Sequence, residues 1–431
     1  MHRMKIVLFV FFFLGGVAAG QDSMTVEQAV QRVLQTHPVL EQALANIRAA
    51  EARALQASSS KFPEISTDAV YAHIGPVPEF SFPLFGSIVL APQDNYDAHI
   101  TGRFTLYDFG KTNTAVDLSQ SRVQTSRDAI ELAKTNLALQ TIRAFYSIVF
   151  LRKSVQVQDE QIEALNQHLS VTQKRATAGT ATNFDVLTTR VRVAAAQNQK
   201  VEIQNSLQKQ ESILRQLLDL PVTSPLTISG SFQQIPVALN QDSLFQLAFQ
   251  QRTELKLARD AEESAKLQKN ASSLGNMPSL KVNAAYGLKN GYEPNIYVMR
   301  GNWMWGAQLQ IPVFDGGRIS HQEEEAQAAI ESEQAHTQDA ERQIRSDVEQ
   351  AVADVHASWS KVQISDVQLQ QAHEAVAIAR TRYETGSVTN LDLLDAETAE
   401  SSARLMSLQA LYRFVVSKYE LGRAVGASFY N

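Results

Sequence analysis

Two short segments of this sequence contain aspartates whose spacing suits helix capping or cation binding. Residues 175–187, RATAGTATNFDVL, return 207 positions later as residues 382–394, RYETGSVTNLDLL. The positions identical in both copies are Arg175, Gly179, Thr182, Asn183, Asp185 and Leu187. An aspartate carboxylate can cap a helix N-terminus, and several carboxylates brought together can hold a cation. Both possibilities stay open at this point.

Each segment is typical of a tight turn between two antiparallel helices. Gly179 and Gly386 can take the positive φ that ends a helix. A threonine stands three residues before Asp185, and another stands three residues before Asp392, which is the spacing of a capping box. We therefore expect the chain to present two helical turns at one end of the molecule.

The other chemically active residue types indicate no further site. The histidines have no HExxH or paired ligand spacing, and most are expected to be solvated helix residues. Beyond the predicted signal peptide they are His37, His73, His99, His168, His321, His336, His356 and His373. No GxSxG motif, phosphate-binding loop or nucleophile–base pair is present. The sequence therefore predicts no enzyme, no cofactor and no metal site.

The first residues and the overall charge limit the class of protein. Residues 1–20 are predicted to be a signal peptide, with basic Arg3 and Lys5, an apolar stretch at 6–14 and small residues at 18–20. The apolar stretch is too short to span a bilayer. The chain has no cysteine, so no disulfide framework is expected. Its net charge of −6 argues against a nucleic-acid partner.

The chain repeats one plan over nearly its whole length. The first repeat is predicted over 21–218 and the second over 241–431, joined by a Pro/Ser/Gly-rich connector at 219–240. Each repeat is expected to begin with one helix, at 23–60 and at 241–272. Coiled-coil helices with 3–4 spacing of apolar residues are expected over 112–218 and 319–424. Helices of this length are too long for the core of one compact domain.

Four segments alternate apolar and polar residues, as strands with two different faces do. They cover about 64–73, 96–107, 279–289 and 301–313. Their length suits tilted membrane-crossing strands. A bilayer permits no open sheet edge, and spanning barrels begin at about eight strands, so several copies would have to join. The alternative is a soluble four-stranded sheet packed on a helix.

The two turns, together with the strand-to-helix junction IPVFDGGRIS (311–320) and its echo LYDFGKTNTA (106–115), resemble the outer-membrane efflux proteins, the TolC-like ducts. The resemblance covers residues 23–426. It implies a mainly α fold with transmembrane β-strands, in which a homotrimer shares a twelve-stranded barrel in the outer membrane and a helical barrel in the periplasm. It also implies a passive exit duct that contacts outer-membrane lipid, a periplasmic adaptor protein and an inner-membrane pump or secretion ATPase.

The resemblance further implies roles for the turns. Tyr383, Asp392 and Asp395, with Asp185, match the ring of residues at the narrowest point of the duct, where three copies of Asp395 would favour bound cations. The expected adaptor-contact tips are Ala178, Gly179, Thr180, Thr385, Gly386 and Ser387. The alternatives are that the aspartates only cap helices and that the tips are only turns.

The sequence departs from the family in one respect and leaves one rival function open. Val388 stands where the family has an arginine tied to the neighbouring aspartate, and Phe184 stands where a threonine would precede Asp185, so the closed state must be held differently. The rival function is a secreted or periplasmic coiled-coil scaffold that never enters a membrane. Nothing in the sequence identifies the exported cargo.

Overall fold

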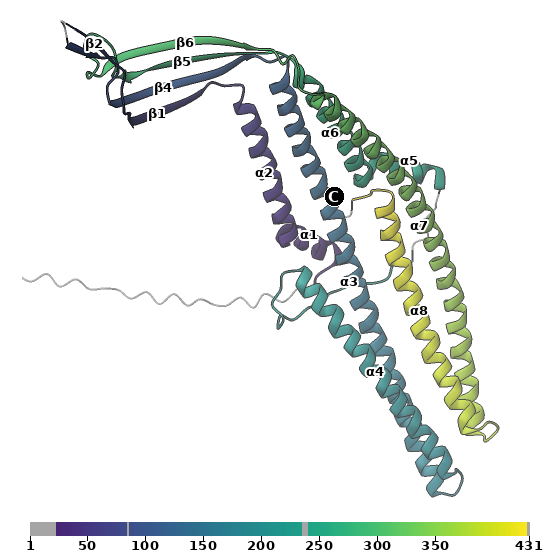
Figure 1. The fold of residues 1–431 in the computed structure, drawn as a ribbon. Helices are drawn as coiled ribbons and strands as arrows, with labels where there is room; N and C mark the ends of the chain where they lie inside the picture. Colours follow the sequence, from purple (N-terminus) through teal and green to yellow (C-terminus); the bar gives the residue numbers. More distant parts are fainter. Residues whose placement is uncertain (1–22, 84–85, 235–239, 429–431) are drawn as a thin grey trace, which may run out of the picture.

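The computed structural model describes residues 23–83, 86–234 and 240–428. A sheet occupies one end of an elongated molecule, and two long helical hairpins extend from it to the other end (Figure 1). The expected signal peptide at 1–20 and part of the expected connector at 219–240 lie outside the described residues.

The first helix of each repeat is interrupted, which corrects the prediction of one continuous helix. The first repeat begins with α1 (Val26–Thr36) and α2 (Pro38–Ser59), and the second with α5 (Gln241–Gln251) and α6 (Thr253–Ser273). Pro38 ends α1 because proline has no N–H and disfavours helical backbone at the residue before it. Both junction residues, His37 and Arg252, have extended backbone.

Four long helices form the body of the molecule. They are α3 (Lys111–Thr177), α4 (Asn183–Leu217), α7 (Arg318–Glu384) and α8 (Asn390–Ala424). Each of α3 and α7 has 67 residues and is about 100 Å long at 1.5 Å per residue. Helix α4 packs against α3, α3 against α8, and α8 against α7, so α4 and α7 lie at opposite edges of this layer.

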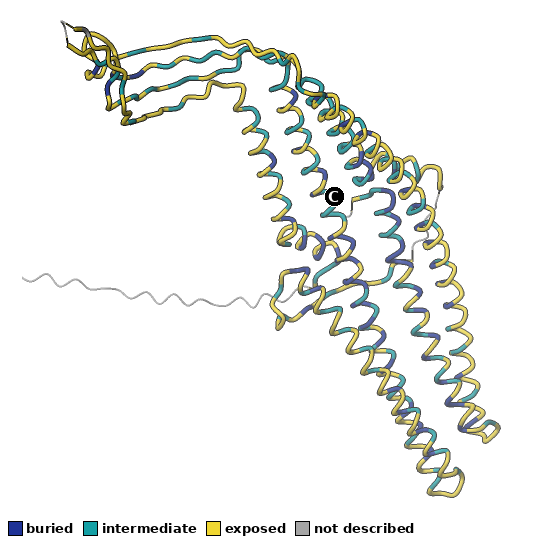
Figure 2. The backbone as a smooth tube through the Cα atoms, viewed as in Figure 1, coloured by how far each residue is buried: buried dark blue, intermediate teal, exposed yellow. Residues whose placement is uncertain are grey.

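The hydrophobic core lies midway along the helices, where buried residues concentrate (Figure 2). Phe145 and Ile142 of α3 are fully buried there against α1, α4 and α8. A second cluster surrounds Phe414 of α8 together with Ile344 and Val348 of α7. Both clusters include residues of α8, which therefore joins the two repeats.

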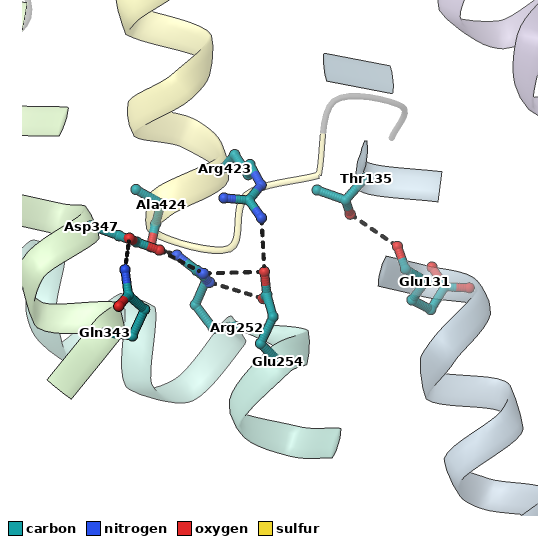
Figure 3. A network of polar contacts seen from close by, with 8 residues as sticks. All are labelled: Glu131, Thr135, Arg252, Glu254, Gln343, Asp347, Arg423 and Ala424. Atoms are coloured by element: carbon teal, nitrogen blue, oxygen red, sulfur yellow. Dashed lines mark hydrogen bonds and ion pairs between the residues drawn. The ribbon is translucent and has the colours of Figure 1, made fainter. Parts of the chain in front are cut away.

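A buried arginine joins the α5–α6 junction to the second hairpin (Figure 3). The Arg252 side chain is 4% exposed and donates to both carboxylate oxygens of Glu254, at 2.9 and 3.1 Å. It also donates to Asp347 at 3.0 Å and to the carbonyl oxygen of Ala424 at 3.1 Å. One guanidinium thereby fixes the junction to α7 and to the end of α8.

The sheet is antiparallel, with the strand order β1-β4-β5-β6. Its strands are β1 (Glu64–His73), β4 (Asp94–Tyr107), β5 (Ser279–Lys289) and β6 (Arg300–Gln310). The last strand ends three residues before the predicted limit of 313. Because β4 pairs with β5, the two repeats share one continuous sheet.

The segment between β1 and β4 contains a small hairpin. It consists of β2 (Glu79–Phe82) and β3 (Gly86–Val89), paired in a separate two-stranded sheet. This hairpin lies beyond the end of the main sheet that is farthest from the helices (Figure 1).

Candidate functional site

Both helical turns contain the predicted capping boxes. In the first, Asp185 accepts from the Thr182 N–H at 2.8 Å, and the Thr182 hydroxyl oxygen accepts from the Asp185 N–H at 3.2 Å. Thr389 and Asp392 repeat the arrangement at the same distances. The hydrogen bonds from the Thr389 hydroxyl and N–H hold the pKa of Asp392 below its ordinary value. Both aspartates therefore complete the capping boxes at the N-termini of α4 and α8.

Asp395 forms an ion pair that the sequence did not predict. Its carboxylate lies 2.6 Å from the guanidinium of Arg192, and the Asp395 side chain is 58% exposed. Arg192 belongs to α4 and Asp395 to α8, so the pair links the two helical hairpins. The partners are 203 positions apart, and no local pattern could have signalled the contact.

Tyr383 is buried against its neighbours in the single chain. Its ring centroid lies 5.2 Å from that of His168 and 4.7 Å from the Arg175 guanidinium. His168 is itself only 8% exposed and lies 2.6 Å from the side-chain oxygen of Asn390. The Asn390 amide donates to the carbonyl oxygen of Asp185 at 3.3 Å. His168 is therefore a buried exception among the histidines, and its contacts join the two turns.

The turns themselves are open to solvent. The six predicted tip residues are all exposed, and the side chain of Phe184 beside them is 69% exposed. Gly179 and Gly386 have φ values of +79° and +75°, the left-handed backbone that glycine adopts without strain. Both turns lie at the end of the molecule opposite the sheet (Figure 1).

The sheet has one apolar and one polar face. Residues paired directly across strands share a face, so the register assigns each side chain. One face carries Ile65, Tyr71, Tyr96, Ile100, Val282, Tyr286, Trp303 and Trp305. The other carries Glu64, Asp68, Asp97, His99, Arg103, Lys281, Lys289 and Arg300. Trp303 and Trp305 are 72% and 74% exposed, because no helix of the described chain covers their face.

Several edges of the described chain lack partners. Strands β1 and β6 each have one unpaired side. Helices α4 and α7 expose apolar side chains: Val191 and Val201 on α4, and Ile364 and Val367 on α7. No helix within the described residues combines the length and hydropathy of a membrane span. The same residues contain no group of three histidine, aspartate or glutamate side chains that could hold a metal ion.

Comparison with known proteins decides the family. The sequence model described as "Outer membrane efflux protein" matches residues 29–219 and 244–427, one segment in each half of the chain. The chain belongs to the outer membrane efflux protein family. The resemblance drawn from the two turns and the strand-to-helix junctions is thereby confirmed.

Relatives and solved structures agree with this assignment. The chain is 21% identical to the outer membrane protein TolC of Escherichia coli over 96% of its own length and 84% of that protein. It is 25% identical to the alkaline protease secretion protein AprF of Pseudomonas aeruginosa, over 65% of its length and 59% of that protein. The Campylobacter jejuni CmeC outer membrane channel has a similar fold, with a TM-score of 0.81 at 14% identity, covering 99% of this chain and 93% of that one.

As a member of this outer membrane efflux protein family, the chain is a passive exit duct for efflux or type I secretion. It resides in the outer membrane and extends into the periplasm, and it is not an enzyme. The predicted fold class, mainly α with transmembrane β-strands and duplicated hairpins, is confirmed. The alternative of a scaffold without membrane insertion is wrong.

Proposed function

We propose that three copies of this chain close into one tube, with β1 and α4 of each copy lying against β6 and α7 of the next. The observation that carries this proposal is the four-stranded sheet with two unpaired sides and two faces of opposite polarity. Unpaired backbone groups at a sheet edge are costly in lipid, and a neighbouring copy satisfies them. Three copies place twelve strands in the barrel, with the apolar face toward outer-membrane lipid.

We propose that the two turns surround the narrowest point of the duct. Asp395, Asp392, Asp185 and Tyr383 are the residues assigned there. The family's arginine–aspartate tie is not available at Val388, and we assign its role to the ion pair between Arg192 and Asp395, which joins the two hairpins. Because the Arg192 guanidinium compensates the Asp395 carboxylate, three copies of the turn present less negative charge than three free aspartates would.

The exposed tips are proposed to contact a periplasmic adaptor protein, itself connected to an inner-membrane pump or secretion ATPase. They are Ala178, Gly179, Thr180, Thr385, Gly386 and Ser387. Three copies with two similar turns each provide six turns in two sets of three, which suits a hexameric adaptor. Exposed side chains at the start of α4 and α8, Phe184 and Leu391, provide apolar contact area beside them.

Single-channel conductance in planar bilayers tests the constriction. Replacing Arg192 with glutamine frees the Asp395 carboxylate and loosens the contact between hairpins, so conductance and cation selectivity are expected to rise. Arg190→Gln, on the same helix, changes the same charge at an exposed residue with no contact to Asp395 and serves as the control. If Arg192→Gln conducts like the unmodified protein, the assignment of this ion pair to the constriction is wrong.

A further inference from the structure

Half of the residue types that the two turns share are not explained by the turns themselves. The shared glycine provides the positive φ, and the shared threonine and aspartate form the capping box. An arginine, an asparagine and a leucine remain. They are Arg175, Asn183 and Leu187 in the first repeat and Arg382, Asn390 and Leu394 in the second. The roles of these three residue types therefore lie outside the turn in which they stand.

Two of them form hydrogen bonds across the within-chain joint, by which we mean the contact of the α3–α4 hairpin with the α7–α8 hairpin. Arg175 of α3 donates to the carbonyl oxygen of Tyr383 of α7 at 3.3 Å. The side-chain amide of Asn390, on α8, donates to the carbonyl oxygen of Asp185, on α4, at 3.3 Å. Both acceptors are backbone groups, so these hydrogen bonds do not require a particular side chain on the partner residue.

The third, Leu394, is fully buried at the same joint. It belongs to a small hydrophobic cluster with Leu165 of α3 and with Val193 and Ala196 of α4. The arginine, the asparagine and the leucine thus each stabilise the within-chain joint. In each case, however, only one of the two copies of the residue does so.

The other copy of each residue is exposed in the single chain. Leu187 is 52% exposed, against 0% for Leu394. Arg382 and Asn183 are also exposed, and neither side chain has a hydrogen-bond partner within the described residues. Arg382 lies at the end of α7, whereas the other two lie in the first turns of α4. These are the two helices at the open edges of the chain.

We infer that the joint between copies repeats the within-chain joint, with α4 of one copy in the place of α8 and α7 of the next copy in the place of α3. The two repeats differ by 207 positions throughout the turns, so each contact can be transferred by that offset. Arg382 then donates to the carbonyl oxygen of Ala176 in the adjoining copy. Asn183 donates to the carbonyl oxygen of Asp392 in the adjoining copy. Such a head-to-tail contact closes into a ring.

The leucine completes this joint. Leu187 of one copy packs against Leu369 and Ala372 of the next, which correspond by the same offset to Ile162 and Leu165. This inference rests on the proposed closure of three copies, and it adds the residues that hold adjoining copies together near the turns.

Two polar contacts of the within-chain joint have no counterpart between copies. Ala375 stands at the position that corresponds to His168, and Ala399 stands at the position that corresponds to Arg192. The joint between copies therefore lacks both the histidine contact and the ion pair. Its stability depends mainly on the repeated arginine, asparagine and leucine, so single substitutions at these residues should have measurable effects.

Cross-linking of the full-length protein in membranes tests the register of this joint. Leu187→Cys combined with Ala372→Cys is expected to give a covalent trimer with a bismaleimide that spans about 10 Å, the separation of packed helix axes. Ala357→Cys replaces Ala372→Cys in the control. Because position 357 lies about 22 Å farther along α7, at 1.5 Å per residue, the control should give only the monomer.

A second pair of cysteines, at the exposed Val201 of α4 and Val367 of α7, separates this inference from the proposed closure. If this second pair links three copies and the pair at 187 and 372 links none, the register inferred here is wrong and the closure stands. If neither pair links copies, the closure fails and the inference fails with it.

The temperature at which the trimer dissociates in detergent tests the individual residues. Leu187→Asn should lower it by about 5 °C or more, because the leucine is buried only between copies, and Arg382→Gln should also lower it. Val171→Asn is the control, since Val171 is 45% exposed on α3, which already packs between α4 and α8 of its own chain. An unchanged dissociation temperature for both Leu187→Asn and Arg382→Gln would overturn the inference.

Discussion

Replacing Asp260 with asparagine is predicted to stabilise the helical body above pH 6. Asp260 on α6 faces Asp128 on α3, and one Asp260 oxygen is buried with no donor. Asp128 is 5% exposed and already accepts from Lys256 and Gln124. Burial, and then the neighbouring Asp128, raise the pKa of Asp260 to about 6. An asparagine amide would instead donate to Asp128 without carrying charge.

The sign and size of the effect follow from the pKa of Asp260 in the two states. Its ordinary value is 3.8 and its folded value about 6, so the unfolded chain loses this proton first as pH rises. Stability contributed by this group therefore falls between about pH 4 and pH 6 and stays reduced above that range. Two pKa units correspond to about 3 kcal/mol, which we discount to about 1.5 kcal/mol because Asp260 is partly exposed to solvent.

Thermal unfolding of the full-length protein between pH 4.5 and 7.5 measures this effect, together with hydrogen exchange of α6. At about 2.1 cal/mol/K per residue, 1.5 kcal/mol shifts the melting temperature by about 2 °C, and Asp260→Asn should gain this at pH 7.5 but little at pH 4.5. Asp117→Asn, at an exposed position on α3, is the control and should show no such difference. An Asp260→Asn variant that is less stable than the unmodified protein at pH 7.5 would refute the reasoning.

Three further predictions concern stability and assembly. Arg252→Met removes the guanidinium partner of the partly buried Asp347 and leaves Glu254 with Arg423 alone, so it should cost about 3 kcal/mol in denaturant unfolding. Arg342→Met at an exposed site should cost under about 0.5 kcal/mol. Gly287→Ala places a Cβ 2.1 Å from the carbonyl oxygen of Ala98, and it should therefore prevent assembly of heat-modifiable oligomers in the outer membrane. At Gly102 a Cβ would lie 3.9 Å from the nearest atom, so Gly102→Ala should assemble normally. Thr389→Ala removes a capping box and should speed hydrogen exchange in the first turn of α8, at a cost of about 1 kcal/mol; unchanged exchange would contradict the capping role.

Features that depend on local sequence were predictable. The threonine–aspartate spacing located both capping boxes, because a cap involves residues only three positions apart. Alternation of apolar and polar residues located the strands of the main sheet, because side chains in a strand alternate between faces. The break at Pro38 was also readable from the sequence, since proline disfavours helix at the preceding residue. The helix-forming composition on both sides of Pro38 nevertheless favours one continuous helix over 23–60.

Features that depend on distant contacts were not predictable from one sequence. His168 is buried only because α8 brings Asn390 against it from 222 positions away. The ion pair of Arg192 and Asp395 likewise requires the two hairpins to be placed side by side. The β2–β3 hairpin lies among prolines that favour a loop assignment, and its two strands have only four residues each. For His168 and for the ion pair, the deciding interaction lies outside the window in which periodicity can be read.

Cross-linking between copies tests most directly whether three chains close into one duct through α4 and α7. Val201 and Val367 are exposed, lie at similar distances from their turns and sit on opposite edges of the chain, which has no cysteine of its own. Cysteines at both positions are treated in membranes with a bismaleimide that spans about 10 Å, the separation of packed helix axes. We predict that a denaturing gel shows bands of cross-linked chains up to the covalent trimer and none larger. These bands should appear only when both cysteines are present. A gel that shows only the monomer, or bands larger than three chains, would contradict the closed trimeric duct.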